Sequence, residues 1–330
     1  MAPTGQFSMQ VTQVQPQHEA QIAGFLRGIF GSGAPTGFFD AGLMRWKFFA
    51  QHPEWSGGRS YAIEQQDGIV AHACVWPGLY AVHLIDWAAS PKAAGAGIAI
   101  YRHLMQLARV VIAIGGSAAA RKVLPKIGFK PYGTVEIFAR PVRPWRQFQT
   151  RPRPSLLREA ARLAHHALWN CVPRHAAPAE WTTQPTARAT LEFPGARSAA
   201  VVNYILECPI ADLKYFVISH HGTPSGYFLL NLCSGQCRIV DIFTTSDWQA
   251  AYRLAIHTAA ALPETCEISA FSSLPRTGVL LRGEAFQKRA ERPVMAYDPD
   301  ARLQNASPLN LQMVDSDAFF LYSPSYPYLT

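Results

Sequence analysis

Residues 90–105, SPKAAGAGIAIYRHLM, place a proline, a run of small residues and two glycines directly before a helix-periodic apolar segment. A tight turn needs fewer small residues than this stretch contains. Gly95 and Gly97 allow the backbone to approach a ligand without a side-chain collision. Successive N–H groups at the start of a helix bind phosphate or pyrophosphate. The stretch therefore predicts an anion-binding loop; the alternative is a small-residue turn packed closely on a neighbouring helix.

Outward from this loop, the apolar spacing predicts helices and strands in a definite order. Before the loop we expect helices at 18–30 and 40–50 and strands at 59–65, 69–76 and 81–88. After it we expect a helix to about residue 108, a strand at 110–115, a helix at 118–127 and a final strand pair ending at Pro141. Helices and strands of this kind indicate an α+β fold with a mixed sheet.

The second half of the chain repeats the first in outline. RIVDIFTTS at residues 238–246 matches HLIDWAASP at residues 83–91, and this match aligns Asp241 with Asp86. The near-constant offset, about 155 residues at each landmark, indicates a tandem duplication. Asp247 and Trp248 stand where the first half has its small residues. A carboxylate and an indole disfavour a bound anion, so the second loop is expected to be empty.

The order of elements and the loop together resemble the GNAT superfamily of N-acyltransferases. Its usual loop is Gln/Arg-x-x-Gly-x-Gly/Ala after a proline; here Pro91, Gly97 and Ala99 take matching positions, and Ala94 replaces the Gln/Arg. GSAAARKVLPKIGF, at residues 116–129, resembles the second cofactor segment of the family, with Leu124 at its usual tyrosine position. The resemblance covers residues 18–140 and, more faintly, 196–298.

This resemblance implies two tandem GNAT-like acyltransferase domains joined by a basic linker and a helix. The expected boundaries are an N-terminal domain with the acyl-CoA loop at 1–145, a linker and bridging helix at 146–190, and a degenerate C-terminal domain with its tail at 191–330. We expect the second domain to shape the acceptor cleft or to carry the contacts of a homodimer.

The resemblance also implies a co-substrate, acetyl-CoA or another acyl-CoA, in a gap between the fourth and fifth strands. No metal is expected. Ser117 has two candidate roles, as the cap of the following helix or as a contact of the pantetheine arm. The residues implied at the coenzyme are Trp87, Ala88, Ala89, Ala94, Gly95, Ala96, Gly97, Ile98, Ala99, Ser117 and Leu124.

Acyl transfer to an amine needs a group that removes a proton from the amine. His83 and Asp86 are the candidates for this base, and a structural role is the alternative for each. Strand alternation places them on opposite faces, unless the strand carries a bulge. Tyr101, Tyr132 or solvent would protonate the leaving thiolate. The tail, with Asp315 and Asp317 followed by tyrosines, is a further candidate for holding the acceptor.

The net charge of +8 is concentrated in one stretch. Glu159 is the single acidic residue among seven arginines, Arg140, Arg143, Arg146, Arg151, Arg153, Arg158 and Arg162. A solvated linker is one interpretation of this stretch; docking of an acidic acyl carrier protein or of a membrane surface is another. The amphipathic helix expected at 155–169 packs on a neighbouring domain or lies on a membrane. No nucleic-acid module is recognisable.

The six cysteines form no disulfide framework, and the chain opens without an export signal. A cytoplasmic protein with reduced thiols is therefore expected. We expect an N-acyltransferase that moves an acyl group from acyl-CoA to the primary amine of a small acceptor, of amino sugar or amino acid type. Two alternatives are a Fem-like or carrier-protein-dependent acyl or aminoacyl transferase, and a non-catalytic module that binds acyl-CoA or a carrier protein.

Overall fold

The computed structural model of the chain describes residues 9–35, 37–66, 68–150, 155–171, 175–303, 308–321 and 328–330. Arg151 and Arg153 of the basic linker, and Tyr322 and Tyr326 of the tail, lie outside these residues. The chain divides into two compact units. Unit 1 consists of Met1–Pro131 and Met295–Gln304, and unit 2 of Tyr132–Val294 and Asn305–Thr330. The domain boundaries expected from the sequence stay a prediction.

Unit 1 contains the elements on both sides of the small-residue loop. They are β1 (Val11–Gln13), η1 (Pro16–His18), α1 (Glu19–Phe30), η2 (Gly31–Gly33), α2 (Ala41–Met44), the π-helical turn η3 (Arg45–Phe49), β2 (Ser60–Gln65), β3 (Gly68–Pro77), β4 (Val82–Ala89), α3 (Ala96–Leu107), β5 (Val111–Ile114), α4 (Ala118–Val123) and η4 (Leu124–Ile127). Strands β1 to β4 pair antiparallel in sequence order, and β5 joins β4 in parallel.

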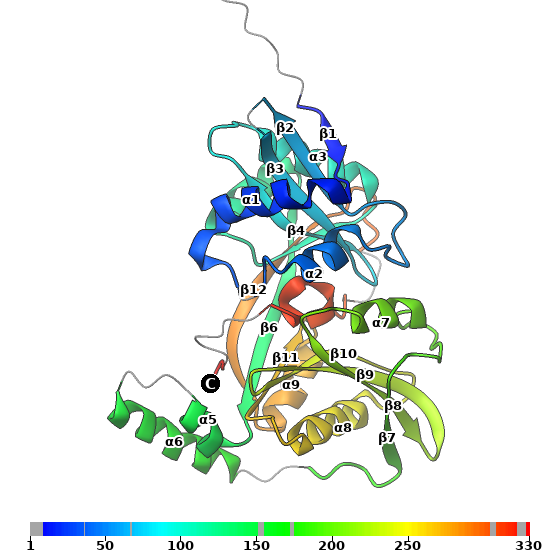
Figure 1. Cartoon of the computed structure of the whole chain (residues 1–330). Helices are drawn as coiled ribbons and strands as arrows, with labels where there is room; N and C mark the ends of the chain where they lie inside the picture. Colours follow the sequence, from blue (N-terminus) through cyan, green and yellow to red (C-terminus); the bar gives the residue numbers. More distant parts are fainter. Residues whose placement is uncertain are drawn as a thin grey trace, which may run out of the picture. The chain divides into compact units, whose positions relative to one another are not determined.

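The strands of unit 1 bury side chains on both faces. Helix α3 packs Ile100 and Leu104 into a core with Ala73 and Val75 of β3. Cys74 lies between those two positions and points to the other face, where its thiol approaches the carbonyl oxygen of Lys47 in η3. Figure 1 shows α1 and α2 in front of the strands. Helices therefore cover both faces, and strand residues alternate between the two cores.

Unit 2 contains most of the remaining elements, and from β7 to α9 they repeat the order seen in unit 1. They are β6 (Lys130–Pro141), α5 (Pro144–Thr150), α6 (Leu156–Asn170), β7 (Trp181–Thr186), α7 (Ala199–Leu206), β8 (Asp212–His220), β9 (Thr223–Cys233), β10 (Gln236–Thr244), α8 (Trp248–Ala261), β11 (Glu267–Ser272), α9 (Pro275–Gly283), β12 (Gln287–Tyr297), η5 (Met313–Asp315) and η6 (Asp317–Phe319). Strands β7 to β10 pair antiparallel in sequence order, and β11 joins β10 in parallel. The predicted α+β repeat is confirmed.

The last strand of each sequence half leaves its own half. The strand pair expected before Pro141 is wrong, because Lys130–Pro141 is one continuous strand, with Gly133 inside it rather than in a turn. This strand, β6, pairs antiparallel with β11 of unit 2. Strand β12 follows β5 in the strand order, and its residues 295–297 belong to unit 1. A strand from the second half of the sequence thus completes unit 1.

The basic linker is partly structural. The Arg143 guanidinium donates to the carbonyl oxygens of Ala260, at 3.0 Å, and Thr265, and Arg146 donates to that of Pro263 at 2.5 Å. These carbonyls lie around the C-terminus of α8, where the helix dipole favours a positive charge. Among the helices in the described part of the chain, none combines the length and apolar composition needed to cross a bilayer.

The cysteines form no disulfide. Cys233 precedes a hairpin turn of Ser234 and Gly235, both with left-handed φ. Burial raises the pKa of the Cys237 thiol to about 12, which keeps it protonated and unreactive. Within the described residues, no three His, Cys, Asp or Glu side chains are grouped as a metal site requires.

Candidate active site

Strands β4 and β5 pair over a short distance and then separate. Their parallel register joins Val82 to Val111 and His83 to Ile112, although β4 continues to Ala89. His83 is buried at the point of separation, and its Nε2 accepts the N–H of Ile114 at 3.3 Å. The imidazole therefore bridges the two strands and satisfies a backbone donor that would otherwise lack a partner in the sheet.

A β-bulge interrupts β4 at Asp86 and Trp87. The register against β3 shifts by one residue between His72 and Cys74, and Asp86 has a left-handed φ of 52°. Aspartate tolerates this region better than most side chains. The register is regular from His83 to Ile85 and shifts only after it, so simple alternation from His83 does not describe the placement of Asp86. Both side chains are buried.

The Asp86 carboxylate is held by a buried lysine. Lys47 Nζ lies 2.6 Å from Asp86 Oδ2, and the two side chains are 0% and 2% exposed. The ammonium also lies over the rings of Phe38 and Phe48, at 4.6 and 4.8 Å from their centroids. The π-helical turn η3 carries Lys47 and directs it into the core. Since a buried charge requires a partner, this pair fixes the bulge in place.

A buried histidine supports the same bulge. His72 Nδ1 lies 3.2 Å from the carbonyl oxygen of Asp86, and its Nε2 lies 2.8 Å from Ser60 Oγ. A neutral ring that donates from Nδ1 and accepts at Nε2 satisfies both contacts. Burial lowers the pKa of His72 to about 4, although Asp86 opposes this shift. The ring therefore stays neutral at physiological pH.

Trp87, Ala88 and Ala89 lead from the bulge to the loop. The Trp87 indole packs edge-on against Tyr101, and its Nε1 donates to the Gly97 carbonyl oxygen at 3.0 Å. Ala88 is buried, whereas Ala89 is half-buried. The indole thus ties the end of β4 to the first turn of α3.

The small-residue loop ends at an open helix N-terminus. Gly95 is the N-cap of α3, with a left-handed φ of 86° and no side-chain cap. Ala94 and Gly95 are exposed, whereas Ala96 and Gly97 are buried. The N–H groups of Ile98 and Ala99 both donate to the Gly95 carbonyl oxygen. No side chain caps this helix N-terminus, which is the kind of helix start that binds anions.

Gly97 serves packing inside the molecule. A Cβ at this position would lie 3.0 Å from Ala89 Cβ and 3.4 Å from Trp87 Nε1. Glycine therefore lets α3 approach β4 closely, and any side chain here would disturb the fold as well as the loop. The exposed residues of the loop are Pro91, Lys92, Ala94 and Gly95.

The second cofactor segment lies after β5. Ser117 Oγ accepts the N–H of Ala120 at 3.1 Å, so the hydroxyl caps α4. Leu124 is buried at 2% exposure and begins η4. Gly128 ends that helix with a left-handed φ of 100°, and Ala285 takes the same conformation at the matching position of the second half.

The second half closes the corresponding helix N-terminus with its own side chain. Asp247 is the N-cap of α8, and its carboxylate accepts the N–H groups of Gln249 and Ala250. The Trp248 ring carries the guanidinium of Arg276 at 5.1 Å. A side chain therefore caps α8, whereas none caps α3.

The second half also keeps the bulge and its buried ion pair. The register of β10 shifts between Ile239 and Asp241, and Arg197 Nε lies 3.2 Å from Asp241 Oδ2. Arg197 also pairs with Asp315 of the tail at 2.6 Å. Asp315 is 2% exposed and thus part of the core of unit 2.

The tail fills the space where β10 and β11 separate. Gln312 Oε1 accepts the N–H of Ile242, and its Nε2 donates to the carbonyl oxygen of the same residue at 3.0 Å. On the other side, Ser273 N–H donates to the Leu311 carbonyl oxygen, and Ser273 Oγ accepts the Leu311 N–H. Arg238, at the position equivalent to His83, donates to the tail carbonyl oxygens of Ala318 and Leu321. The tail thus occupies the strand opening of unit 2.

Comparisons with known proteins place this geometry in a known fold. No family model matches the chain, and no curated protein matches it in sequence. A GCN5-related N-acetyltransferase of Anabaena variabilis is similar in structure, with a TM-score of 0.56, 13% identity, and coverage of 88% of this chain and 72% of that one. A tandem GNAT protein from the clavulanic acid biosynthesis pathway gives a TM-score of 0.55 at 11% identity over 88% and 98%.

A putative acetyltransferase of Pyrococcus horikoshii gives a TM-score of 0.52 at 9% identity, covering 94% of this chain and 92% of that one. Identities this low speak for the fold alone. The chain has the fold of tandem GNAT proteins, as its loop and repeat predicted.

The sequence analysis missed Lys47 and Arg197. Lys47 lies between β1 and β2, and Arg197 lies between β7 and β8; they are 39 and 44 residues ahead of the aspartates that they pair with. A lysine within the apolar run WKFF was the available signal, since a charge at a core position of a helix requires a partner.

We predict that Lys47→Met destabilises the protein by about 3–5 kcal/mol, because it leaves the Asp86 carboxylate buried without its partner. Chemical denaturation at neutral pH measures the loss. Arg45→Met is the matched control: Arg45 sits in the same segment, but its pair with Glu19 is exposed. Equal stability of the two variants would contradict a structural role for the buried pair.

We also predict that stability falls as the pH drops from about 6.5 to 4. The folded-state pKa of His72, about 4, lies below the ordinary value of 6.5, so protons bind the unfolded chain first. His72 contributes about 3 kcal/mol to the free energy of unfolding above pH 6.5. This contribution is lost as the pH falls to about 4. Denaturation at several pH values tests this, and His72→Gln should flatten the slope in that window. If stability depends on pH in the same way in the His72→Gln variant, other groups cause that dependence.

Proposed function

We propose that the protein is an N-acyltransferase that moves an acyl group from acyl-CoA to the primary amine of a small acceptor. One observation carries the proposal: the first half leaves the N-terminus of α3 open beside separated strands, whereas the second half closes both features. The two halves have similar arrangements of strands and helices, and the first half retains a geometry suited to a ligand. The fold of tandem GNAT proteins supports the same activity.

The residues present fit a coenzyme A molecule. Its pyrophosphate requires backbone donors and a positive field, and Ala94 and Gly95 lie exposed at the uncapped start of α3. Lys92 is exposed in the same loop, and residues 87–99 include no acid. The pantetheine arm requires backbone partners in an extended form, which β4 offers beyond His83. The acyl thioester of the coenzyme supplies the reactive carbonyl.

We assign the proton-accepting role to His83 rather than to Asp86. The Asp86 carboxylate is already neutralised by Lys47 and is 2% exposed, which suits a positioning residue that holds the bulge. His83 lies where the strands separate, and an imidazole has the proton affinity that this step needs near neutral pH. During turnover its Nε2 would exchange the Ile114 N–H for the proton of the amine.

Protonation of the departing thiolate falls to solvent in this proposal. The Tyr101 hydroxyl is buried, and burial raises its pKa far above the ordinary value. The Tyr132 hydroxyl accepts the N–H of Leu309 within unit 2. A thiol of ordinary pKa leaves without a dedicated acid.

We predict a single acetyl-CoA site per chain by calorimetry. Ala94→Glu should weaken binding about tenfold or more, because it places a carboxylate beside the pyrophosphate donors. Ala200→Glu, an exposed alanine on α7 of the second half, is the matched control. A second site of equal affinity, or normal binding by Ala94→Glu, would refute the assignment of the loop. Longer acyl-CoAs and an acyl carrier protein, tested alongside, distinguish the donor.

We predict that His83→Gln lowers turnover roughly 10²–10⁴-fold while acetyl-CoA affinity is retained. Glutamine keeps an acceptor for the Ile114 N–H and cannot take a proton near neutral pH, so it separates chemistry from folding. Release of free thiol from acetyl-CoA with a panel of amino sugars and amino acids measures the rate. Full turnover by His83→Gln, with the acidic limb of the pH profile retained, would place the base elsewhere.

A further inference from the structure

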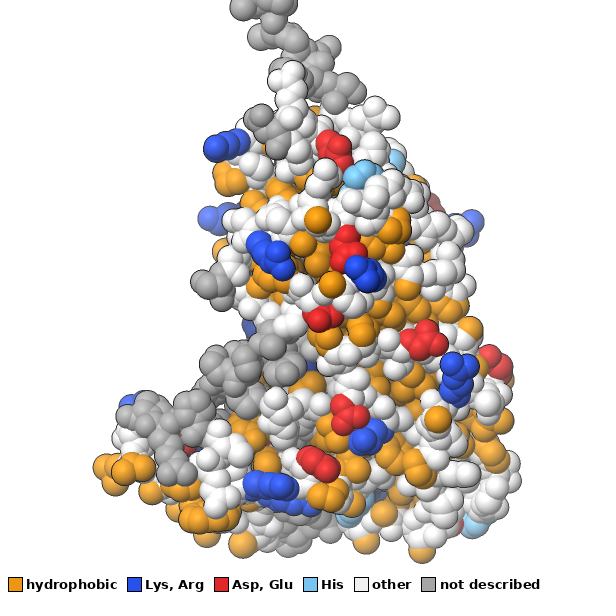
Figure 2. Space-filling view, viewed as in Figure 1, with side chains coloured by type: hydrophobic (Ala, Val, Ile, Leu, Met, Phe, Trp, Pro, Cys, Tyr) orange, Lys and Arg blue, Asp and Glu red, His pale blue; other side chains and the backbone are white. Residues whose placement is uncertain are grey.

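Helix α6 of unit 2 buries its polar side and exposes its apolar side. Glu159 and His166 are 3% and 4% exposed, whereas Leu156, Leu157 and Leu168 are 68%, 84% and 73% exposed. Figure 2 shows hydrophobic side chains gathered at the lower left of the view, where α6 lies in Figure 1. A helix that borders only water normally has the opposite arrangement.

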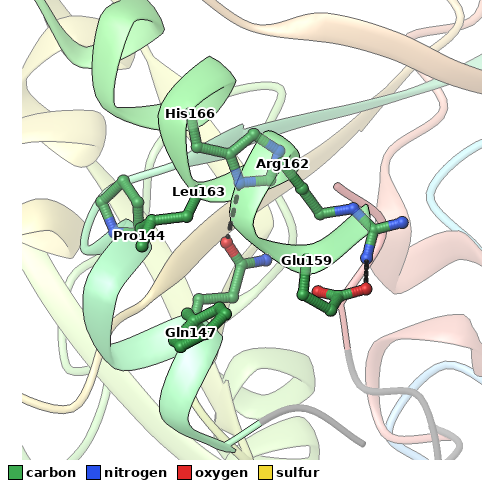
Figure 3. Close-up of a pocket in the computed structure, with 7 residues that line it drawn as sticks. Pro144, Gln147, Glu159, Arg162, Leu163 and His166 are labelled. Carbon is green, nitrogen blue, oxygen red and sulfur yellow. Dashed lines mark hydrogen bonds and ion pairs between the residues drawn. The ribbon is translucent and has the colours of Figure 1, made fainter. Parts of the chain in front are cut away.

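Specific contacts fix this orientation. Figure 3 shows the small pocket between α5 and α6, where Glu159 pairs with Arg162 at 2.5 Å and His166 Nδ1 lies 3.2 Å from Gln147 Oε1. Gln147 in turn donates to Thr330 Oγ1 at 2.9 Å. The polar side is thus anchored to the body of unit 2, and rotation of α6 to bury its leucines would break these contacts.

The exposed apolar residues form one continuous face. At 3.6 residues per turn they span an arc of about 140°. We name this surface the leucine face; it consists of Leu156, Leu157, Ala160, Ala161, Ala164, Ala167 and Leu168, all exposed. A continuous exposed apolar surface on a soluble unit marks an interaction site.

A positive charge borders the leucine face. Arg158 is exposed beside it on α6. The acid of the helix, Glu159, is buried and neutralised by Arg162. Trp145 of α5 is 60% exposed, and tryptophan is a residue type enriched at membrane–water interfaces. These features favour a partner that is apolar and negatively charged.

We propose that the leucine face docks on an anionic lipid bilayer, with α6 lying in the plane of the membrane. The leucines enter the acyl-chain boundary, and Arg158 meets the lipid phosphates. A second copy of the chain is the less suitable occupant. A two-fold contact through this face would offer Arg158 no acidic partner on α6, because the one acid of that helix, Glu159, is buried against Arg162.

The test uses the full chain and extruded vesicles. The protein should co-sediment with vesicles of phosphatidylcholine and phosphatidylglycerol, and much less with phosphatidylcholine alone. Added salt should weaken the binding because it screens the charge of Arg158. Absence of sedimentation with the anionic vesicles at low salt would overturn the proposal.

Variants locate the contact. Leu157→Ser with Leu168→Ser should lower partitioning roughly tenfold per leucine, since each leucine loses its apolar burial. Arg158→Gln should remove part of the preference for anionic vesicles. Val279→Ser is the matched control, an equally apolar residue that is 66% exposed on α9.

Thermal unfolding verifies that the variants remain folded, as expected for exposed positions. Unchanged sedimentation of the double leucine variant would overturn the proposal. So would a wild-type dimer in gel filtration that the double variant dissociates while vesicle binding stays absent, because the face would then join two copies.

Discussion

The buried ion pair of Lys47 and Asp86 is the constraint on which the first half of the molecule depends. Moving two charges out of water costs several kcal/mol per ion, so the pair persists only where geometry and surroundings repay that cost. Here the atoms lie 2.6 Å apart, and two phenylalanine rings cover the ammonium. The bulge that carries Asp86 follows the last residue of β4 that pairs with β5. The buried ion pair therefore holds the bulge beside the point where β4 and β5 separate.

The two halves share one arrangement of strands, bulge and buried ion pair, but they differ in whether a place for a ligand remains open. Both keep a bulge with a buried aspartate and a cation that arrives from an earlier segment. They differ at the start of the helix that follows the bulge and at the place where the two parallel strands separate. The first half ends its loop with glycine and has no side-chain cap on α3, whereas Asp247 caps the second helix and Gln312 satisfies the backbone of Ile242. A few polar side chains therefore decide which half can take a ligand, while the buried frame stays the same.

Much of the fold could be predicted from the sequence, because its signals are local. The small residues at 90–99, the apolar periodicity and the matching aspartates at 86 and 241 all lie in short stretches. The partners of those aspartates could not be predicted, since Lys47 and Arg197 reach them only through the tertiary fold. Gly97 shows the same limit: its sequence context suggested contact with a ligand, and its neighbours in space are Ala89 and Trp87. The path of β6 and β12 was likewise unpredictable, because strand partners across such distances leave no local pattern.

That path of β6 and β12 has a consequence for the order of events during synthesis. Residues 295–297 of β12 belong to unit 1, although most of that unit is made before residue 132. The N-terminal unit therefore cannot complete its sheet when it leaves the ribosome, and must wait for about half of the chain to follow. Contacts of such sequence separation slow folding, and the unpaired edge of β5 stays open to other strands meanwhile. The end of the second half is therefore needed before the first unit is complete.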